Sequence, residues 1–301
     1  MNILKYKKYY LYLTIAILLP LVLSLIVFGL NLSIDFTGGS VTKYTLDNTD
    51  QIQSILDIYS QNNIEVISSS NSSSNVLTIS SQIVPVEVNK SIFDKVVELN
   101  SNISQNYFET IGPAVGGETT LNAFKSVFWA SLAILLYIAY AFRNIPNEYS
   151  SINFGLSAII AMLHDALFLF GVFSILGFFY DIKIDSLFIT AVLTVIGFSV
   201  HDTIVVFDRL RENLNKLPKT WQFEKIANYS LVETLTRSLA TSLTVLLTLL
   251  SLYILGGESI KNFVLALLIG ITAGTYSSIF VATPTLVFLT SKKLFHNKDK
   301  K

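Results

Sequence analysis

The sequence has no cysteine, only six prolines and few charged residues. Without cysteine there are no disulfide bonds, thiolate metal sites or cysteine nucleophile. Charged residues make up 14% of the 301 residues, against roughly 25% in an average soluble domain. Basic and acidic residues balance at 21 each, so no net charge favours nucleic acid as a partner. With 51% hydrophobic residues, the composition predicts a membrane protein.

The three histidines are His164, His201 and His296, and they lie in different segments of the chain. None has a second ligand at the spacing of a known metal motif. We therefore expect no metal ion and no cofactor. His164 and His201 are interpreted first as polar packing residues.

Six apolar runs are long enough to cross a bilayer as helices, which takes about 20 residues. The first follows three lysines and has no convincing cleavage site, so we expect it to remain as an uncleaved helix. Within the sixth run, Gly270 and Gly274 have the spacing of a close helix–helix contact. The runs cover residues 9–30, 122–142, 151–176, 187–207, 237–255 and 263–290.

Positive charge predicts the orientation of these helices. Five Lys and Arg residues lie in a loop at 208–235, and five more lie in a tail at 291–301. The loops on the opposite side carry only Lys183 and Lys261. By the positive-inside rule, both termini are cytoplasmic and the polar segment 31–120 is outside. The resulting domains are 1–30, 31–120, a helical bundle at 121–290 with an amphipathic cytoplasmic loop at 208–235, and the basic tail at 291–301. Residues 214–236 are interpreted as an interfacial amphipathic segment.

The polar segment has the pattern of a small α+β domain. Short β-branched runs predict strands, amphipathic spacing predicts helices, and the serine-rich stretch 69–75 predicts a turn. The order βαββαβ is ferredoxin-like. We therefore predict a polytopic α-helical membrane protein with this domain between helices 1 and 2. The predicted strands are 41–46, 64–68, 76–80 and 103–110, and the predicted helices are 49–60 and 86–99.

Three ionisable residues, Asp165, Asp202 and Arg237, fall within the apolar runs. A charged side chain at a helix centre costs about 2.5–3.5 kcal/mol on translocon scales, so such residues usually have a partner or a task. Asp202 is roughly 8–9 Å from the cytoplasmic edge at 1.5 Å per residue. Arg237 lies near the same edge at the start of its helix, unless that helix continues upstream through 229–236. Residues 202 and 237 are therefore able to face each other at similar depth.

Hydroxyl groups accompany these charges. Ser199, Asp202 and Thr203 share one face of a helix, because residues three and four apart are neighbours. A carboxylate, a guanidinium and hydroxyls in a low-dielectric bundle suit a proton-binding site. The alternative is a static ion pair or hydrogen-bond cluster that only holds the bundle together.

Five stretches together resemble the SecF family of the bacterial Sec translocase accessory complex, within the RND superfamily. The resemblance covers nearly the whole chain in order, and its fourth stretch is long and specific. The stretches are IDFTGGS at 34–40, IGPAVG at 111–116, the HD pair at 164–165, GFSVHDTIVVFDRLREN at 197–213 and TLTRS at 234–238.

The resemblance implies roles for individual residues. The family's membrane acid corresponds to Asp202 and its arginine to Arg237, while His164 and Asp165 match its HD pair. His201 stands where the family usually has asparagine. The family motif after the first helix includes Asp35, Phe36, Gly38 and Gly39, and its two glycines are equally interpreted as a turn that admits positive φ.

The resemblance further implies that the protein uses the proton motive force to help preproteins cross and leave the cytoplasmic (inner) membrane, and that it is not an enzyme. Six helices are half of the twelve usual in RND machines, so SecD is expected as the partner. SecYEG, YajC, translocating preproteins and membrane lipids are further expected partners. Coupling to protons or to sodium ions stays open.

Three rival functions keep some of these features. Half of an RND small-molecule exporter would share the acid–arginine pair but usually has a much larger outer domain. An intramembrane aspartyl protease needs two carboxyls, but the residues before Asp202 do not form its GxGD motif. In a structural scaffold of the translocon, Asp202→Asn would be silent.

Overall fold

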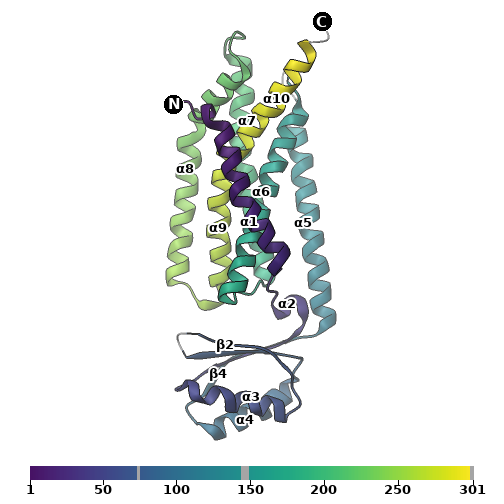
Figure 1. Ribbon diagram of the computed structural model, residues 1–301, viewed down its shortest axis with the longest axis vertical. Helices are drawn as coiled ribbons and strands as arrows, with labels where there is room; N and C mark the ends of the chain where they lie inside the picture. The colour runs from purple at the N-terminus through teal and green to yellow at the C-terminus, as the bar shows by residue number, and fades with distance from the viewer. Residues whose placement is uncertain (73–74, 144–148, 299–301) are drawn as a thin grey trace. The chain divides into compact units, whose positions relative to one another are not determined.

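The computed structural model describes residues 1–72, 75–143 and 149–298, and the chain forms two compact units (Figure 1). The helical unit comprises Met1–Leu30 and Ser126–Lys301. The sheet unit comprises Asn31–Lys125. Each unit has its own core, and each is described separately below.

In the described residues, six helical segments are long and apolar enough to cross a membrane, as the sequence predicts. The fifth apolar run belongs to a helix that starts well before it, and the sixth is a chain of α9, a π-helical turn and α10. The main helices are α1 (Lys7–Phe28), α5 (Pro113–Ala141), α6 (Ser151–Tyr180), α7 (Ser186–Lys216), α8 (Phe223–Leu255), α9 (Lys261–Ser277) and α10 (Thr283–Lys298).

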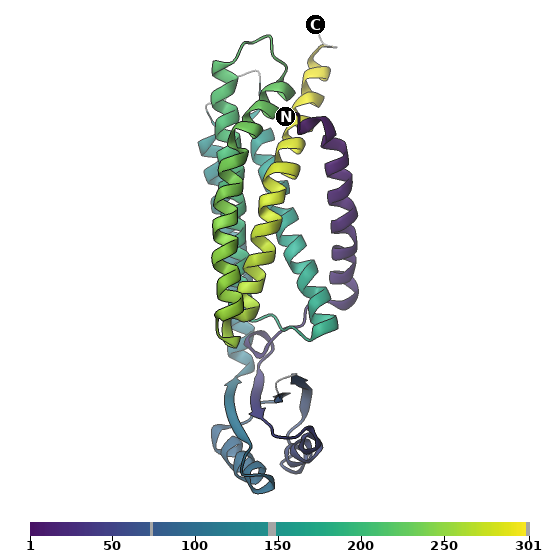
Figure 2. The ribbon, with the colours of Figure 1, turned by 90° about the vertical axis from the view of Figure 1, so that its left-hand side faces the viewer.

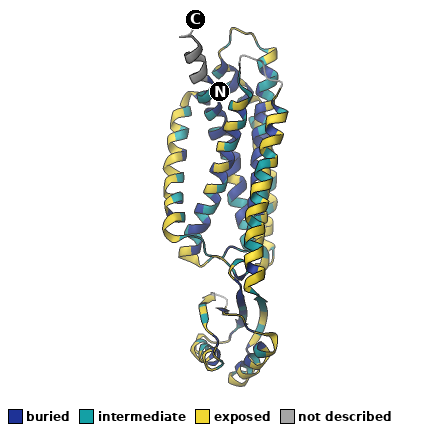
Figure 3. Cartoon of the chain, turned by 90° about the vertical axis from the view of Figure 1, so that its right-hand side faces the viewer, coloured by how far each residue is buried: buried dark blue, intermediate teal, exposed yellow. Residues whose placement is uncertain are grey.

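Burial divides these helices into central and peripheral ones (Figure 3). In the sixth segment 67% of the apolar window is buried inside the protein, against 11% for α8. The exposed large apolar side chains of the peripheral helices are mostly leucine, isoleucine and aromatic residues. Such apolar surfaces suit contact with lipid chains.

Close packing of α9 against α7 forms the centre of the helical unit. A Cβ atom at Gly270 would lie 2.3 Å from Cγ2 of Val195, and one at Gly274 would lie 3.0 Å from Cβ of Ser199. Only glycine permits this approach, which confirms the close contact predicted from the spacing of the two glycines. The contact brings the C-terminal part of α9 against the buried face of α7.

The segment 214–236, predicted to be amphipathic and interfacial, is mostly helical. In it α7 continues to Lys216 and α8 begins at Phe223. Both helices extend beyond their apolar parts, because polar residues of α7 pair there with polar residues of α8. Arg209 forms an ion pair with Glu233, and Asn213 Nδ2 donates to Ser230 Oγ at 3.0 Å. A polar clamp therefore continues the hairpin beyond its apolar part.

The sheet unit contains an antiparallel sheet with strand order β2-β3-β1-β4. Together with the two helices this is the predicted ferredoxin-like arrangement. Both helices lie on one face of the sheet (Figures 1 and 2). The elements are β1 (Gly39–Thr45), α3 (Ile52–Gln61), β2 (Val66–Ser72), β3 (Val76–Ser81), α4 (Val86–Leu99) and β4 (Ser104–Ile111).

The serine-rich stretch 69–75 is not simply a turn, as predicted, because β2 runs to Ser72. Ser69 pairs with Ile79 and Asn71 pairs with Leu77 across the antiparallel ladder. These hydrogen bonds are made by the backbone, so the neighbouring strand imposes the extended form on residues with low strand propensity. Residues 73–74 of the predicted turn lie outside the described residues.

A pair of tyrosines lies in the core between sheet and helices. Tyr44 of β1 and Tyr59 of α3 are fully buried, and their hydroxyl oxygens are 3.1 Å apart. Burial raises the pKa of both phenols, and for Tyr44 the neighbouring Tyr59 adds to the increase. Both side chains therefore stay neutral in the folded unit at a pH where tyrosines of the unfolded chain ionise.

We predict that the sheet unit loses stability as the pH rises above about 10, the ordinary pKa of tyrosine. Above that pH the unfolded chain releases protons that the folded unit retains, so the free energy of unfolding falls. Protease resistance of the sheet unit in the full-length chain, measured across this pH range, tests this. The Tyr44→Phe, Tyr59→Phe double variant should lose resistance less steeply with pH. Equal slopes for this variant and the wild type would contradict the prediction, and Tyr107→Phe is the control with an exposed tyrosine.

Candidate functional site

Two carboxyl groups are buried inside the helical unit. Asp165 on α6 is 0% exposed, and Asp202 on α7 is 4% exposed. Their helices pack against each other and against α9. Because an unpaired charge at this position is costly, the partners of each carboxyl decide what the site can do.

Asp165 has hydrogen-bonding partners from three helices. Nδ1 of His164 lies 2.9 Å from its Oδ1. Its Oδ2 accepts hydrogen bonds from Ser277 Oγ of α9 at 2.7 Å and from Ser199 Oγ of α7. An ionised carboxylate only accepts hydrogen bonds, and these partners occupy most of its acceptor capacity. Asp165 therefore ties α6, α7 and α9 together.

Among the described residues, Asp202 accepts from a single hydroxyl donor. Ser278 Oγ, from the π-helical turn after α9, lies 3.1 Å from its Oδ2. Ser199 and Thr203 are buried on the same side of α7, which confirms the face predicted from their spacing. His201 points to the surface of the unit, because adjacent residues on a helix differ by about 100°. No hydrogen bond joins Asp202 to Asp165 in the described residues.

Arg237 does not meet Asp202, contrary to the prediction. It lies 14 residues after Phe223, about 21 Å along α8, and Asp202 lies 14 residues before Lys216, the last residue of α7. The two residues are therefore at similar depth, as predicted, and what differs is the direction of the Arg237 side chain. The buried side of α8 carries Ser238 and Ser242, and Arg237 is exposed beside it. Across the residues described, no carboxylate forms an ion pair with Arg237. The guanidinium therefore lies on a surface of α8 that the helical unit itself does not cover.

The sequence did not identify Ser277 and Ser278 as site residues. Both are completely buried, and each donates to a different carboxyl. In the sequence they stand out only as small residues in an apolar helix. The signal that points to them is the pair of hydroxyls itself, because buried serines in membrane helices usually bond across helices.

A cavity of about 620 Å³ reaches His164 from the side of α1 and α9. Its walls are mostly apolar, and Thr14 and Tyr276 close one part of it with a hydrogen bond of 3.1 Å between their hydroxyls. Within the described part of the chain, no cluster of His, Cys, Asp or Glu has the geometry of a metal site. The polar groups near this cavity are the imidazole of His164, the hydroxyls of Thr14, Thr272 and Tyr276, and the carboxyl of Asp165 that His164 contacts.

The motif after the first helix forms a second candidate site, within the sheet unit. Residues 34–37 make a single helical turn, α2, capped by Ser33, whose Oγ accepts from the backbone N–H of Asp35. Gly38 follows at φ +71° and ψ 171°, a conformation open almost only to glycine. Gly39 begins β1, where a Cβ would lie 2.8 Å from the carbonyl oxygen of Ser81. The turn reading of the glycines is therefore confirmed by the backbone.

This motif packs against the start of α5. A Cβ at Gly38 would lie 2.9 Å from Cα of Pro113, and one at Gly116 would lie 3.0 Å from the carbonyl oxygen of Phe36. Thr120 Oγ1 also donates to that carbonyl at 3.4 Å. The stretches 34–40 and 111–116, which the sequence shows far apart, thus form one joint where the chain enters and leaves the sheet unit.

Two family models match the chain at these sites. The model described as "Protein export membrane protein SecD/SecF, C-terminal" matches residues 91–292, which is more than half of the chain. The chain belongs to the SecD/SecF family. A second model, "SecD/SecF GG Motif", matches residues 23–50 and includes Gly38 and Gly39. Both confirm the family inferred from the sequence motifs.

Individual SecD/SecF relatives match along nearly the whole chain. The protein translocase subunit SecF of Thermobaculum terrenum is 43% identical over 304 residues, covering 97% of this chain and 94% of the relative. Protein translocase subunit SecDF of Bacillus subtilis is 35% identical over 285 residues, covering 92% of this chain but 36% of the relative. The crystal structure of SecDF, a translocon-associated membrane protein from Thermus thermophilus, gives a TM-score of 0.83 at 29% identity, covering 97% of this chain and 39% of that one.

The family thus consists of accessory subunits of the Sec translocase and not of classical enzymes, and this member is a multi-pass membrane protein. The chain spans a SecF relative almost completely. It spans little more than a third of the SecDF chains.

For the joint of this SecD/SecF chain, we predict that Gly38→Ala destabilises the sheet unit by about 1–3 kcal/mol, the usual strain of a side chain in such a conformation. The added methyl group would also press on the backbone of Pro113. Limited proteolysis of the full-length chain under increasing denaturant measures the change. Gly117→Ala is the control, because a Cβ there meets no atom within 4 Å. Equal resistance of the two variants would show that the joint tolerates a side chain.

Proposed function

We propose that this SecD/SecF chain couples proton movement across the cytoplasmic membrane to the translocation and release of preproteins. The observation that carries the proposal is the difference between the two buried carboxyls. Asp165 is held by partners on three helices, whereas Asp202 accepts from one hydroxyl. Fewer lone pairs of Asp202 are engaged in hydrogen bonds, so its carboxylate is the one that binds the proton. Asp165 holds the surrounding helices in place.

The exposed position of Arg237 supports a partner with a second set of helices. An uncovered guanidinium in a membrane helix is costly, at about 2.5–3.5 kcal/mol at the helix centre. The SecDF relatives contain a further segment, because this chain accounts for only 36% and 39% of their lengths. We infer that SecD supplies the equivalent segment in trans and covers the side of α8 with Arg237 and the side of α7 with His201.

The imidazole of His201 lies on the side of α7 that we propose SecD covers. It is exposed in this chain and directly precedes Asp202, where the family usually has asparagine. An imidazole is able to bind and release a proton, unlike an amide. In the proposed mechanism His201 therefore supports the proton step from the side that SecD covers, and it does not replace Asp202.

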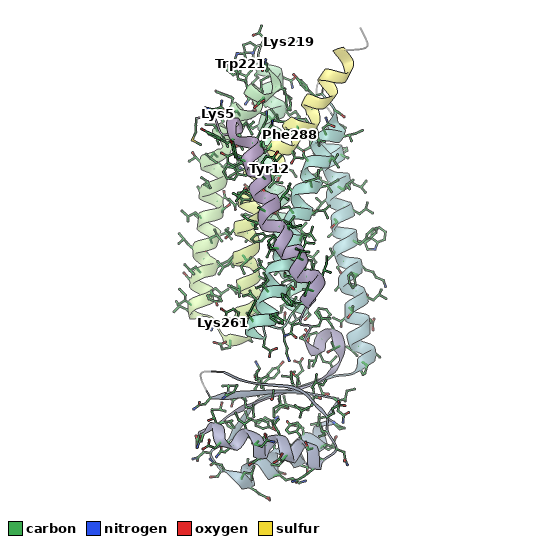
Figure 4. All side chains as sticks on the ribbon, viewed as in Figure 1. Lys5, Tyr12, Lys219, Trp221, Lys261 and Phe288 are labelled. Carbon is green, nitrogen blue, oxygen red and sulfur yellow. The ribbon has the colours of Figure 1, made fainter. Side chains whose placement is uncertain are left out.

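The distribution of charge supports the orientation. Lys5, Lys219 and Trp221 lie at one end of the helical unit, and Lys261 lies at the other (Figure 4). With the positive-inside rule, the first end is cytoplasmic and both termini are inside. In this orientation the sheet unit is outside, where it meets emerging preproteins. SecYEG, YajC and the surrounding lipids are the further contacts that we propose.

The proposal predicts that Asp202→Asn and Arg237→Met abolish only the gradient-dependent part of preprotein release. Asn cannot take up a proton at this position, and Met cannot supply the charge for the partner. Release is measured in membrane vesicles that contain SecD and SecYEG, first with the proton gradient intact and then with it collapsed. Both variants should give the level seen without a gradient, and a sodium gradient tests the alternative ion.

Two control variants test whether any polar change has the same effect. Asp208→Asn removes an exposed carboxylate of α7 that pairs with Arg211. Thr241→Val removes a hydroxyl one turn after Arg237 that, within the described part of the chain, donates to the backbone of its own helix. Both should release preproteins normally. If Asp202→Asn and Arg237→Met also release normally at equal membrane levels, the acids are a structural cluster and the chain acts as a scaffold.

A further inference from the structure

Ser277 and Ser278 are consecutive residues whose hydroxyls serve different carboxyls. Ser277 Oγ lies 2.7 Å from Oδ2 of Asp165, and Ser278 Oγ lies 3.1 Å from Oδ2 of Asp202. The two carboxyls belong to different helices and share no direct hydrogen bond in the described residues. One turn of the sixth membrane segment therefore contacts both acids at once.

This turn is not an ordinary α-helix. Residues 278–282 form a π-helical turn between α9 and α10. Pro284, the second residue of α10, accounts for it, because proline has no N–H and its ring displaces the carbonyl group four residues earlier. π-helical turns have wider hydrogen-bonding geometry and are frequent at functional sites. The segment after Ser277 is thus able to change its hydrogen bonds without breaking a regular helix.

Each hydroxyl has a second acceptor within reach. Ser278 Oγ is also 3.1 Å from the carbonyl oxygen of Thr275, and Ser277 Oγ is 3.1 Å from that of Gly274. A serine hydroxyl carries one proton but accepts as well as donates. At any moment it therefore donates either to its carboxylate or to the backbone, and it is able to accept from a carboxylic acid while it donates to the backbone.

The other ionisable groups around this turn come from the packed helices. His164 contacts Asp165 on α6, and its ring lies 6.3 Å from that of Tyr276 on α9. His201 on α7 and Arg237 on α8 are exposed. In the described residues, Ser278 is thus the one side chain that donates to Asp202.

We propose that Ser278 is a positioning residue that follows the protonation of Asp202. With Asp202 ionised, the hydroxyl of Ser278 donates to the carboxylate. When Asp202 gains a proton, its new O–H donates to Ser278 Oγ, and the hydroxyl of Ser278 turns to the Thr275 carbonyl. Only an O–H bond on Asp202 forms, and no bond of the serine breaks.

The neighbouring serine extends this change to the second carboxyl. Because Ser277, the last residue of α9, directly precedes Ser278, a shift of the backbone at Ser278 moves the hydroxyl that donates to Asp165. Thr275, whose carbonyl receives the turned hydroxyl, also bonds through its own side chain to Ser242 of α8 at 2.7 Å. A proton at Asp202 is thereby communicated to α6 and to the helix that carries Arg237. This inference rests on the proposed function, because it specifies how protonation of Asp202 changes the hydrogen bonds of the neighbouring helices.

Infrared spectroscopy of the full-length chain in lipid vesicles tests the proposal. The band of protonated Asp202 is identified as the carboxylic C=O band that appears on acidification and is missing in Asp202→Asn. In Ser278→Ala we expect this band at higher frequency, because a hydrogen-bond partner is lost, and with a displaced titration midpoint. Ser278→Thr keeps the hydroxyl and should restore both values.

Ser174→Ala is the matched control, because Ser174 is an equally buried serine of α6 that contacts neither carboxyl. It should leave the Asp202 band unchanged. The proposal is overturned if Ser278→Ala also leaves the frequency and midpoint unchanged. It is equally overturned if Asp202→Asn removes no band across the pH range in which the chain stays folded.

The same variants separate this inference from the proposed function. If Ser278→Ala shifts the Asp202 band but Asp202→Asn leaves gradient-dependent release intact, Ser278 follows the proton and the coupling to export is wrong. If Asp202→Asn abolishes that release while Ser278→Ala changes neither band nor release, the export function stands and the role of Ser278 is overturned.

Discussion

The burial of two carboxyl groups among membrane-spanning helices is the constraint on which the helical unit depends. A carboxyl in this setting needs donors from neighbouring helices, since both side chains are buried among them. The donors are an imidazole and three serine hydroxyls, which come from α6, α7, α9 and the turn that follows α9. Serine side chains on closely packed helices meet this need. A serine side chain is short, so its hydroxyl reaches a carboxyl on the next helix only where the two backbones are close.

The glycines of α9 make that short reach possible. Gly270 and Gly274 let α9 contact α7 so closely that Ser277 and Ser278, one turn further on, lie within hydrogen-bonding distance of the acids. A larger residue at Gly274 would separate α9 from Ser199, which itself donates to Asp165. The packing of the helices and the solvation of the carboxyls are therefore one property of the sequence. Pro284 then releases the helix from regular geometry just after this contact.

Much of the architecture could be predicted from the sequence, because it depends on local patterns. Long apolar runs define the membrane helices, and alternating β-branched runs define the sheet unit. The mistakes occur where contacts between distant residues decide. The extension of α7 to Lys216 and the start of α8 at Phe223 accompany the ion pair between Arg209 and Glu233, and the extension of β2 depends on pairing with β3. No local pattern contains either contact.

The site shows the same division. Asp165 and Asp202 stand out in the sequence because a charge in an apolar run is rare, but serines in such runs are common, so Ser277 and Ser278 do not. The joint between 34–40 and 111–116 is likewise not predictable from local sequence. A side chain at either glycine would collide with the backbone of the other stretch, more than seventy residues away in the chain. A resemblance names the two motifs, but the structure gives the physical reason for both.

Arg237 shows why a single chain is only part of the proposed machine. The sequence suggested that it neutralises Asp202. In the helical unit, however, the hydroxyl of Ser278 donates to Asp202, and Arg237 is exposed. A cation that is not needed inside the unit, and is costly against lipid, requires an anionic or polar partner outside it. The buried side of α8 faces α9, with Ser242 bonded to Thr275, so a partner on the exposed side would be connected to the acids through one helix. Such a placement lets a second set of helices respond to the charge of Asp202 without touching it.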